Sequence, residues 1–254
     1  MQLNGKTALV TGGASGLGGA TAAAFHAEGC KVVLLDIDEE KGNAHASALG
    51  DGARYVRTDV TGEASVQAAV DSALAEEGAI HICVNCAGIG PPAKTVGKDG
   101  PHPLDLFETV IRINLIGTFN VARIAAHAMQ SNEPEEGERG VIVNTASVAA
   151  YEGQIGQVAY AASKGGIVGM TVPMSRDLAR TGIRVNTIAP GIFDTPLLAG
   201  LPENVREALG QMVLNPQRLG QPEEFAALAV FMAKSQYMNG ETVRLDGGIR
   251  MQPR

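Results

Sequence analysis

Short runs of apolar, β-branched residues alternate with longer Ala-rich segments along the whole chain. Such runs are typical of parallel strands buried on both faces, and the longer segments are typical of the helices that connect them. We expect strands at about residues 6–11, 31–36, 54–58, 80–85, 140–145, 183–189 and 241–245. We expect helices at about residues 16–28, 38–49, 62–77, 105–130, 158–180, 203–213 and 222–234. The alternation therefore predicts an α/β fold, a doubly wound parallel seven-stranded sheet with helices on both faces.

The composition excludes several classes of partner. The formal net charge is −7 and the 20 Lys and Arg are scattered, so neither nucleic acid nor a membrane surface is an expected partner. Cysteines are too few for a disulfide framework, the histidines lack the spacing of a metal site, and no apolar stretch is long enough to span a membrane. Because the first residues lead straight into an expected strand, we expect no targeting segment. We expect a cytoplasmic protein that acts on small molecules, folded as one domain over residues 1–254 with substrate loops at 90–103 and 192–214.

A glycine-rich turn joins the first expected strand to the first expected helix. Gly12, Gly16 and Gly18 stand where a phosphate would approach free N–H groups at a helix N-terminus, and a Cβ there would hold it off. Strand, turn and helix together predict a Rossmann-like dinucleotide site, although the spacing G-x-x-x-G-x-G differs from the common G-x-G-x-x-G. Ser15 and Leu17, between these glycines, are expected to contact the cofactor as well.

The ends of the next three strands favour NAD over NADP. Asp36 ends the second strand, where its carboxylate can accept hydrogen bonds from ribose hydroxyls and would repel a 2′-phosphate. The glycine-rich turn contains no Arg or Lys that would offset this repulsion. Asp59 and Val60 follow the third strand and suit an adenine ring, although Asp59 is also an ordinary helix N-cap. Small residues at the end of the fourth strand let the backbone pass close to a cofactor, with expected contacts at Asn85, Ala87 and Gly88.

Ser147, Tyr160 and Lys164 have the spacing S-x12-Y-x3-K, which puts the last two on one face of a helix. The ordinary pKa of a tyrosine is ~10, so its phenol needs a neighbouring positive charge to exchange protons at neutral pH. An ammonium about 5 Å away, at an effective dielectric constant near 20, supplies about 3 kcal/mol. Ser147 would hold the substrate oxygen beside Tyr160. The three residues predict interconversion of an alcohol and a ketone, with Tyr160 as general base and acid.

With these motifs and Asn85-Cys-Ala-Gly88, the chain resembles the short-chain dehydrogenase/reductase family over essentially its whole length. The resemblance implies that Asn114 is a fourth catalytic residue, which holds a water linked to Lys164. It implies that Lys164 also binds the ribose hydroxyls next to the nicotinamide, with Tyr160 beside it. Further cofactor contacts that it implies are Pro190, Gly191, Ile192 and Thr195. The family usually forms tetramers, so a homotetramer is expected.

Within the family, the segments 144–150, 152–157, 163–170 and 244–253 resemble the enzymes that oxidise short or branched 3-hydroxyacyl-CoA. This resemblance implies NAD-dependent oxidation of such thioesters, with Gln154 as a further substrate contact. Two alternatives stay open: a reductase of steroids or of 3-oxoacyl carrier protein, and an NAD-binding sensor without turnover. Six apolar residues after Thr195 would form either a mobile lid over an acyl chain or an ordinary helix core. These residues are Leu197, Leu198, Leu201, Met212, Val213 and Leu214.

Overall fold

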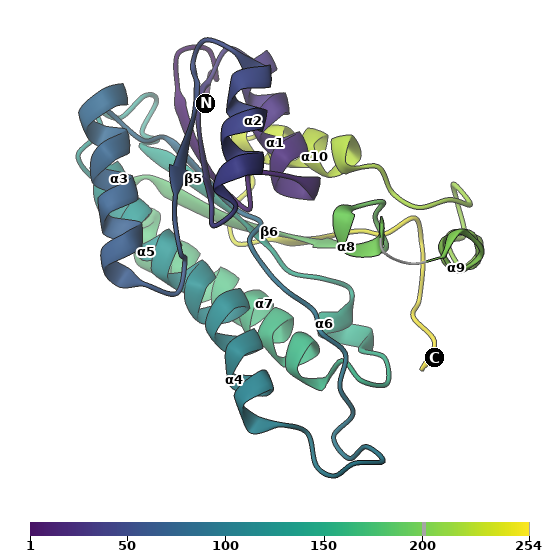
Figure 1. Ribbon diagram of the computed structural model, residues 1–254. Coiled ribbons are helices and arrows are strands. Elements are labelled where there is room, and N and C mark those ends of the chain that lie inside the picture. The colour runs from purple at the N-terminus through teal and green to yellow at the C-terminus, as the bar shows by residue number, and fades with distance from the viewer. Residues whose placement is uncertain (200–201, 254) are drawn as a thin grey trace.

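The computed structural model describes residues 1–199 and 202–253, and a single parallel sheet forms its centre. Its strands are β1 (Thr7–Thr11), β2 (Lys31–Asp36), β3 (Ala53–Arg57), β4 (Ile82–Asn85), β5 (Gly140–Thr145), β6 (Ile183–Pro190) and β7 (Thr242–Leu245). They lie in the order β3-β2-β1-β4-β5-β6-β7, and every neighbouring pair is parallel. All the expected strands are present, and the predicted single-domain, doubly wound fold is confirmed (Figure 1).

Successive strand residues enter two separate hydrophobic cores, because side chains alternate between the faces of a strand. In β1, Ala8 and Val10 belong to one core, whereas Leu9 belongs to the other. In β2, Val32 and Val33 are divided in the same way. Burial on both faces explains why these strands are continuous apolar runs in the sequence.

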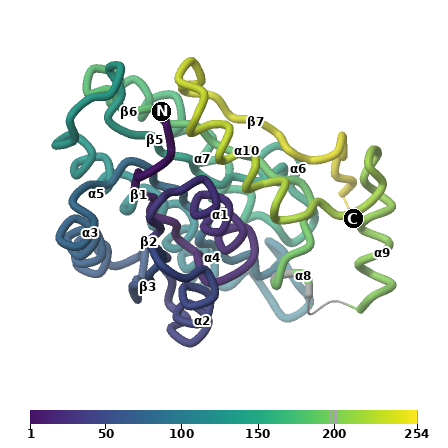
Figure 2. The backbone as a smooth tube through the Cα atoms, turned by 90° about the horizontal axis from the view of Figure 1, so that it is seen from above, coloured from purple at the N-terminus to yellow at the C-terminus, as the bar shows by residue number. Residues whose placement is uncertain are grey.

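Helices cover both faces of this sheet. One face is covered by α1 (Gly16–Ala27), α2 (Glu39–Leu49) and α10 (Pro222–Lys234). The other face is covered by α3 (Glu63–Glu77), α5 (Gly117–Met129) and α7 (Val158–Leu178). Phe25 of α1 and Phe225 of α10 are fully buried in the first core, and these two helices lie side by side although they are far apart in the sequence (Figure 2).

The direction of winding reverses at β1. This strand pairs with β2 on one side and with β4 on the other. The connection that follows β1 leads to β2 and the connection that follows β4 leads to β5, so the two leave in opposite directions. A reversal of this kind opens a crevice at the carboxyl edge of a sheet, where ligands bind. The loop at 90–103, which follows β4, projects away from the sheet (Figure 1).

The main departure from the expected elements lies in the helix predicted at 105–130. It is divided into α4 (Leu104–Ile111), a π-helical turn (Arg112–Ile116) and α5. A π turn holds an extra residue and is frequent at functional sites, and this one carries Asn114. A single continuous helix was the wrong expectation, because the local residues alone give no sign of the insertion.

Two short helices were not predicted and follow strands at the carboxyl edge. They are α6 (Ala149–Glu152), after β5, and α8 (Pro196–Ala199), after β6. The expected helix at 203–213 is present as α9 (Glu203–Gln211), and a 3₁₀ turn (Ala179–Thr181) ends α7. In residues 1–199 and 202–253, no helix has the length and apolar character needed to cross a lipid bilayer.

Candidate active site

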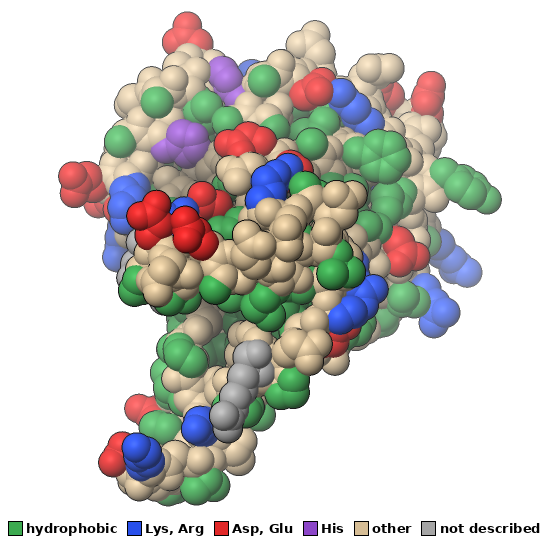
Figure 3. All heavy atoms as spheres, turned by 90° about the vertical axis from the view of Figure 1, so that its right-hand side faces the viewer, with side chains coloured by type: hydrophobic (Ala, Val, Ile, Leu, Met, Phe, Trp, Pro, Cys, Tyr) green, Lys and Arg blue, Asp and Glu red, His purple; other side chains and the backbone are tan. Residues whose placement is uncertain are grey.

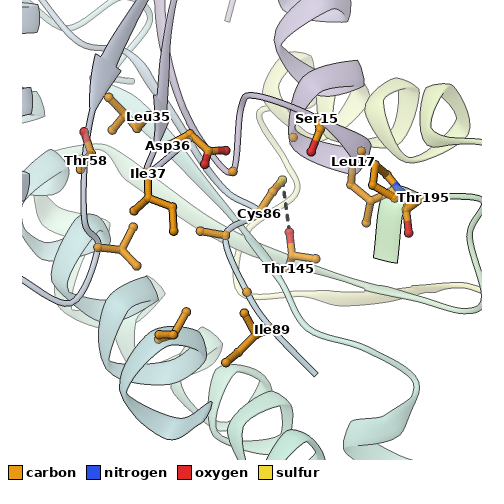
Figure 4. A pocket seen from close by; sticks show the side chains of 18 of the residues that line it. Ser15, Leu17, Leu35, Asp36, Ile37, Thr58, Cys86, Ile89, Thr145 and Thr195 are labelled. Atoms are coloured by element: carbon orange, nitrogen blue, oxygen red, sulfur yellow. Dashed lines mark hydrogen bonds between the residues drawn. The ribbon is translucent and has the colours of Figure 1, made fainter. Parts of the chain in front are cut away.

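A pocket of about 410 Å³ opens at the carboxyl edge of the sheet (Figure 4). Its volume suits a small-molecule ligand. Most of the residues expected to bind a cofactor line it: Gly12, Ser15, Gly16, Leu17, Gly18, Asp36, Asp59, Val60, Ala87, Gly88, Tyr160, Lys164, Pro190 and Thr195. The fold thus brings together segments that are widely separated in the sequence, as the strand-end pattern predicts.

The backbone conformation and close packing of the glycine-rich turn leave no room for larger residues at several of its glycines. Gly12 and Gly16 have φ angles of +64° and +55°, in the left-handed region. A Cβ on Gly12 would lie 3.0 Å from the backbone nitrogen of Ala87, and a Cβ on Gly18 would overlap the carbonyl of Gly12. Within the described residues, the N-cap Ser15 makes no side-chain capping bond, so the first N–H groups of α1 are left to a ligand.

The carboxylate of Asp36 is oriented by the turn that it faces. One oxygen accepts a hydrogen bond from the N–H of Ala14 at 3.1 Å, and the other accepts one from the N–H of Asp38 at 3.1 Å. On the opposite side of the turn, the Thr11 hydroxyl accepts a hydrogen bond from the N–H of Cys86 at 3.0 Å. The turn is therefore fixed to the ends of both β2 and β4, which the spacing of the glycines does not reveal.

Ser147, Tyr160 and Lys164 come together, as their spacing predicts. Ser147 lies close enough to Tyr160 to lower the pKa of its phenol, and Nζ of Lys164 lies 5.6 Å from the centre of the Tyr160 ring. Lys164 is only 4% exposed and donates a hydrogen bond to the carbonyl of Thr145 at 2.8 Å. The Ser147 hydroxyl also accepts a hydrogen bond from the N–H of Ala149 at 3.1 Å. The end of β5 and the start of α6 thus hold the groups that flank the phenol.

The pKa values in this cluster differ from the sequence-based expectation. Burial raises the pKa of Tyr160 above its ordinary value of 10, and the neighbouring Ser147 hydroxyl opposes this shift only in part. Burial also lowers the pKa of Lys164 from 10.5 to about 8. Burial removes both groups from water, which costs free energy when they are charged. The sequence-based estimate used only the distance between the two charges and leaves this cost out. The protein alone therefore does not make this phenol acidic at neutral pH, and a further positive charge is needed for it to act as a base.

We expect the buried lysine to appear in the pH dependence of stability. Below pH 8 Lys164 is protonated in the folded and the unfolded chain, whereas between pH 8 and pH 10.5 only the unfolded chain holds this proton. The free energy of unfolding therefore rises with pH in this window. Relative to Lys164→Met, the wild type should gain about 2 kcal/mol between pH 7.5 and pH 9.5 in urea denaturation. A difference between the two proteins that stays constant over this range would contradict the lowered pKa.

Asn114 does not line the pocket but supports it from the π turn. Its fully buried side chain accepts a hydrogen bond from the N–H of Ile89 and donates one to the carbonyl of Ile89, both at 2.8 Å. It also donates to the hydroxyl of Ser163 at 3.1 Å, which in turn donates to the carbonyl of Tyr160 at 2.7 Å. Asn114 therefore links the loop after β4 to the helix that carries Tyr160. The expected role in holding a water stays a prediction.

Three residues expected to contact the cofactor do not line the pocket. Asn85 is buried and donates a hydrogen bond to the side chain of Asn144 at 3.0 Å, which fixes the ends of β4 and β5 together. Gly191 packs against Asp246, where a Cβ would lie 2.8 Å from the Asp246 Cα. Ile192 lines a neighbouring cavity instead. Their structural contacts are with the protein, and their roles toward a cofactor stay predictions.

The residues expected to contact substrate are only partly assembled. Gln154 lines a separate surface depression, where its amide nitrogen donates to the carbonyl of Gln252 at 3.0 Å. Among the apolar residues after Thr195, Val213 is buried, whereas Leu214 is 74% exposed. Leu201 and the side chain of Leu197 lie outside the described part of the chain.

The pocket also contains residues that sequence reasoning missed: Leu35, Ile37, Thr58, Cys86, Ile89, Ile113, Thr145, Ala146 and Pro196. Most of them are apolar or small and look like ordinary core residues in a sequence. Cys86 and Thr145 had a usable signal, since each is close to an expected site residue at a strand end. The Thr145 hydroxyl and the Cys86 sulfur are hydrogen-bonded at 3.5 Å, between β5 and β4 (Figure 4).

Comparison with known proteins agrees with this geometry. A family model described as enoyl-(acyl carrier protein) reductase matches residues 12–250. The 3-hydroxyacyl-CoA dehydrogenase type-2 of Bos taurus is 53% identical over 254 residues, which cover 99% of this chain and 97% of the relative. The chain belongs to the short-chain dehydrogenase/reductase family. The resemblance stated from the sequence motifs is therefore confirmed.

Two solved members of the short-chain dehydrogenase/reductase family have nearly the same structure. The 3-hydroxyacyl-CoA dehydrogenase type-2 from Mycobacterium avium is 45% identical, with a TM-score of 0.94 over 100% of both chains. The 3-ketoacyl-(acyl-carrier-protein) reductase from Brucella melitensis, solved with NADH, is 32% identical, with a TM-score of 0.89 over 98% of this chain and 100% of the other. As a member of this family, the chain is an oxidoreductase that acts on a small molecule with a nucleotide cofactor.

Proposed function

We propose that this short-chain dehydrogenase/reductase oxidises 3-hydroxyacyl-CoA with NAD, using Tyr160 as general base and, in the reverse direction, as general acid. One observation carries the proposal. Tyr160, with Ser147 beside its phenol and its ring 5.6 Å from Lys164, lines the same pocket as the glycine-rich turn. A proton-transferring phenol and a dinucleotide cradle in one pocket are what hydride transfer from an alcohol requires.

In this mechanism the substrate oxygen is held between the hydroxyl groups of Ser147 and Tyr160. During oxidation the Tyr160 phenolate takes the hydroxyl proton as the carbinol hydride leaves. During reduction the phenol returns that proton, while Ser147 donates a hydrogen bond to the developing alkoxide. Lys164 is fixed by the Thr145 carbonyl, so its ammonium stays beside the ring and favours the phenolate. When bound, oxidised nicotinamide accepts the hydride and adds a positive charge near the phenol.

The choice of NAD rests on Asp36. Its carboxylate lines the pocket and would repel a 2′-phosphate, whereas it can accept hydrogen bonds from ribose hydroxyls. Among the described residues that line this pocket, Lys164 is the one cationic side chain, and it lies beside Tyr160. Among the described residues that line the pocket, no Arg therefore offsets the negative charge of Asp36. The NADH-bound relative supports the same cofactor here.

The substrate class rests on the relatives and on an apolar surface. The relatives with the highest identities reported above are named for 3-hydroxyacyl-CoA. A recess lined by hydrophobic side chains lies on the side of the molecule that carries α8 and α9 (Figure 3). Leu214, which follows α9 in the chain, is 74% exposed. A recess of this character suits an acyl chain better than a small polar alcohol.

We also propose that the active protein is a homotetramer, with the outer face of α7 in one interface. Nothing lies within 4 Å of where a Cβ on Gly169 would be, and Val172 is 41% exposed. Gly166 differs, because a Cβ there would lie 2.7 Å from a methyl group of Leu115. Gly166 therefore allows packing inside the chain, whereas Gly169 leaves a smooth surface for another helix.

A substrate panel tests the proposed function. The purified protein is incubated with NAD and, separately, a 3-hydroxyacyl-CoA, a hydroxysteroid or a simple secondary alcohol, and the absorbance of NADH is followed. We expect the highest kcat/KM with the 3-hydroxyacyl-CoA. A higher kcat/KM with the hydroxysteroid would contradict the proposed substrate class and indicate a steroid dehydrogenase. The absence of turnover with every substrate, in either direction, would instead favour a sensor that binds NAD without reaction.

A further inference from the structure

A cluster of charged side chains connects β7 to the segment that follows β5. Arg244 of β7 donates two hydrogen bonds to the carboxylate of Glu152, the last residue of α6, at 2.8 and 3.3 Å. Its Nε donates to Asp246 at 2.8 Å, and its guanidinium lies 5.5 Å from the centre of the Tyr151 ring. The Arg244 and Glu152 side chains are 23% and 24% exposed, so this ion pair is partly shielded from water. A shielded, bidentate pair fixes the positions of both side chains.

The same carboxylate also binds the chain that follows β7. Glu152 accepts a hydrogen bond from the N–H of Met251 at 2.9 Å. Two further hydrogen bonds continue the contact: the side-chain amide of Gln154 donates to the carbonyl of Gln252, and the N–H of Ile155 donates to the carbonyl of Pro253, both at 3.0 Å. This segment runs down toward the loop after α6 (Figure 1). Residues 251–253 are thus hydrogen-bonded to Glu152, Gln154 and Ile155, in the segment that leads from α6 to α7.

This attachment lies between two residues of the active site. Ser147 precedes α6 by two positions, and Tyr160 lies in the first turn of α7, eight residues after Glu152. The backbone from Ser147 to Tyr160 has to hold both hydroxyl groups at hydrogen-bonding distance from one substrate oxygen. A rigid anchor in the middle of this stretch restricts the motion of both ends.

We propose that Glu152 and Arg244 are positioning residues for the reaction: by fixing α6 to β7 and to residues 251–253, they hold Ser147 against Tyr160. This inference rests on the proposed function of Tyr160. It predicts a specific consequence beyond loss of stability. The neighbouring Ser147 hydroxyl lowers the pKa of Tyr160, so a less well placed Ser147 leaves the phenol with a higher pKa. Two other titratable side chains lie in this region: Lys164, whose Nζ is 5.6 Å from the centre of the Tyr160 ring, and Cys86, which is next to Lys164.

The Glu152→Gln variant tests the inference by removing the charge while keeping the shape of the side chain. We expect kcat/KM for 3-hydroxyacyl-CoA to fall about tenfold, and the affinity for NADH to stay within about twofold. The pH profile of kcat/KM for oxidation should move its acidic limb to higher pH, in the same direction as in Ser147→Ala. Arg244→Lys, which keeps the positive charge, should restore part of both properties relative to Arg244→Met.

A second pair of variants tests the attachment of the chain after β7. Met251→Pro removes the N–H that Glu152 accepts, whereas Met251→Ala keeps it. Only the proline variant should shift the pH profile. Glu77→Gln is the matched control, because Glu77 forms a comparably shielded ion pair with Arg54 at the end of α3. It should leave the pH profile unchanged.

The inference is overturned if Glu152→Gln and Met251→Pro keep the pH profile and kcat/KM of the Glu77→Gln control. It is also overturned if NADH affinity falls as much as kcat/KM, because the effect would then be a general loosening of the fold. An active Tyr160→Phe would overturn the proposed function as well. An inactive Tyr160→Phe with an unchanged Glu152→Gln profile would overturn the positioning role alone.

Discussion

The Tyr160→Phe variant should oxidise 3-hydroxyacyl-CoA about 10³-fold more slowly than the wild type, with unchanged affinity for NADH. The substitution removes one hydroxyl group and keeps the ring, which packs close to Gly90. In the proposed mechanism, the lost hydroxyl is the group that takes the substrate proton. The loss should therefore appear in kcat rather than in cofactor binding.

Tyr237→Phe is the matched control for this experiment. Tyr237 is fully exposed after α10 and lies outside the pocket, so removal of its hydroxyl should leave turnover unchanged. Initial rates of NADH formation at saturating substrate give the comparison. A Tyr160→Phe protein that keeps more than about a tenth of the wild-type rate would refute the role of this phenol.

The second large effect is expected at Asp36. Asp36→Ala should raise the Kd for NADH by about 10- to 100-fold, because hydrogen bonds to a charged group contribute roughly 1.5–3 kcal/mol. The same change removes the repulsion of a 2′-phosphate, so the preference for NAD over NADP should fall by about 100-fold. Part of the loss comes from the turn itself, since the Ala14 N–H loses its acceptor.

Asp38→Ala separates the contribution of this one carboxylate from that of negative charge in general. Asp38 lies two residues away, caps α2 and pairs with Lys41 at 2.7 Å, but it does not line the pocket. Its replacement should leave the ratio of kcat/KM values for NAD and NADP nearly unchanged. Equal ratios for the wild type and Asp36→Ala would show that Asp36 does not select the cofactor.

The fold and the cofactor cleft could be predicted because burial leaves a direct trace in the sequence. Strands buried on both faces have to be apolar throughout, as in Ala8-Leu9-Val10, and a turn that passes close to neighbouring backbone has to be glycine at Gly12 and Gly18. The spacing of Tyr160 and Lys164 on one helix is equally local. Each of these features depends on residues that are close together along the chain.

The features that could not be predicted depend on contacts between distant residues or on burial. The π turn at Asn114 is visible only once its side chain is seen to hold the backbone of Ile89. The ion pair of Glu152 and Arg244 joins residues 92 positions apart. The pKa of Tyr160 rises because the phenol is buried, and a sequence gives the identity of neighbours on a helix but not their loss of water.

The most direct test of the central role of Tyr160 is a titration of its phenol in the presence and absence of oxidised NAD. Tyrosinate formation is followed by difference absorbance in the wild type and in Tyr160→Phe. We predict that the wild type alone shows a tyrosine that ionises at lower pH when NAD is bound, because the cofactor's positive charge adds to that of Lys164. Identical titration curves for the two NAD-bound proteins would contradict the role of Tyr160 as the proton-transferring group.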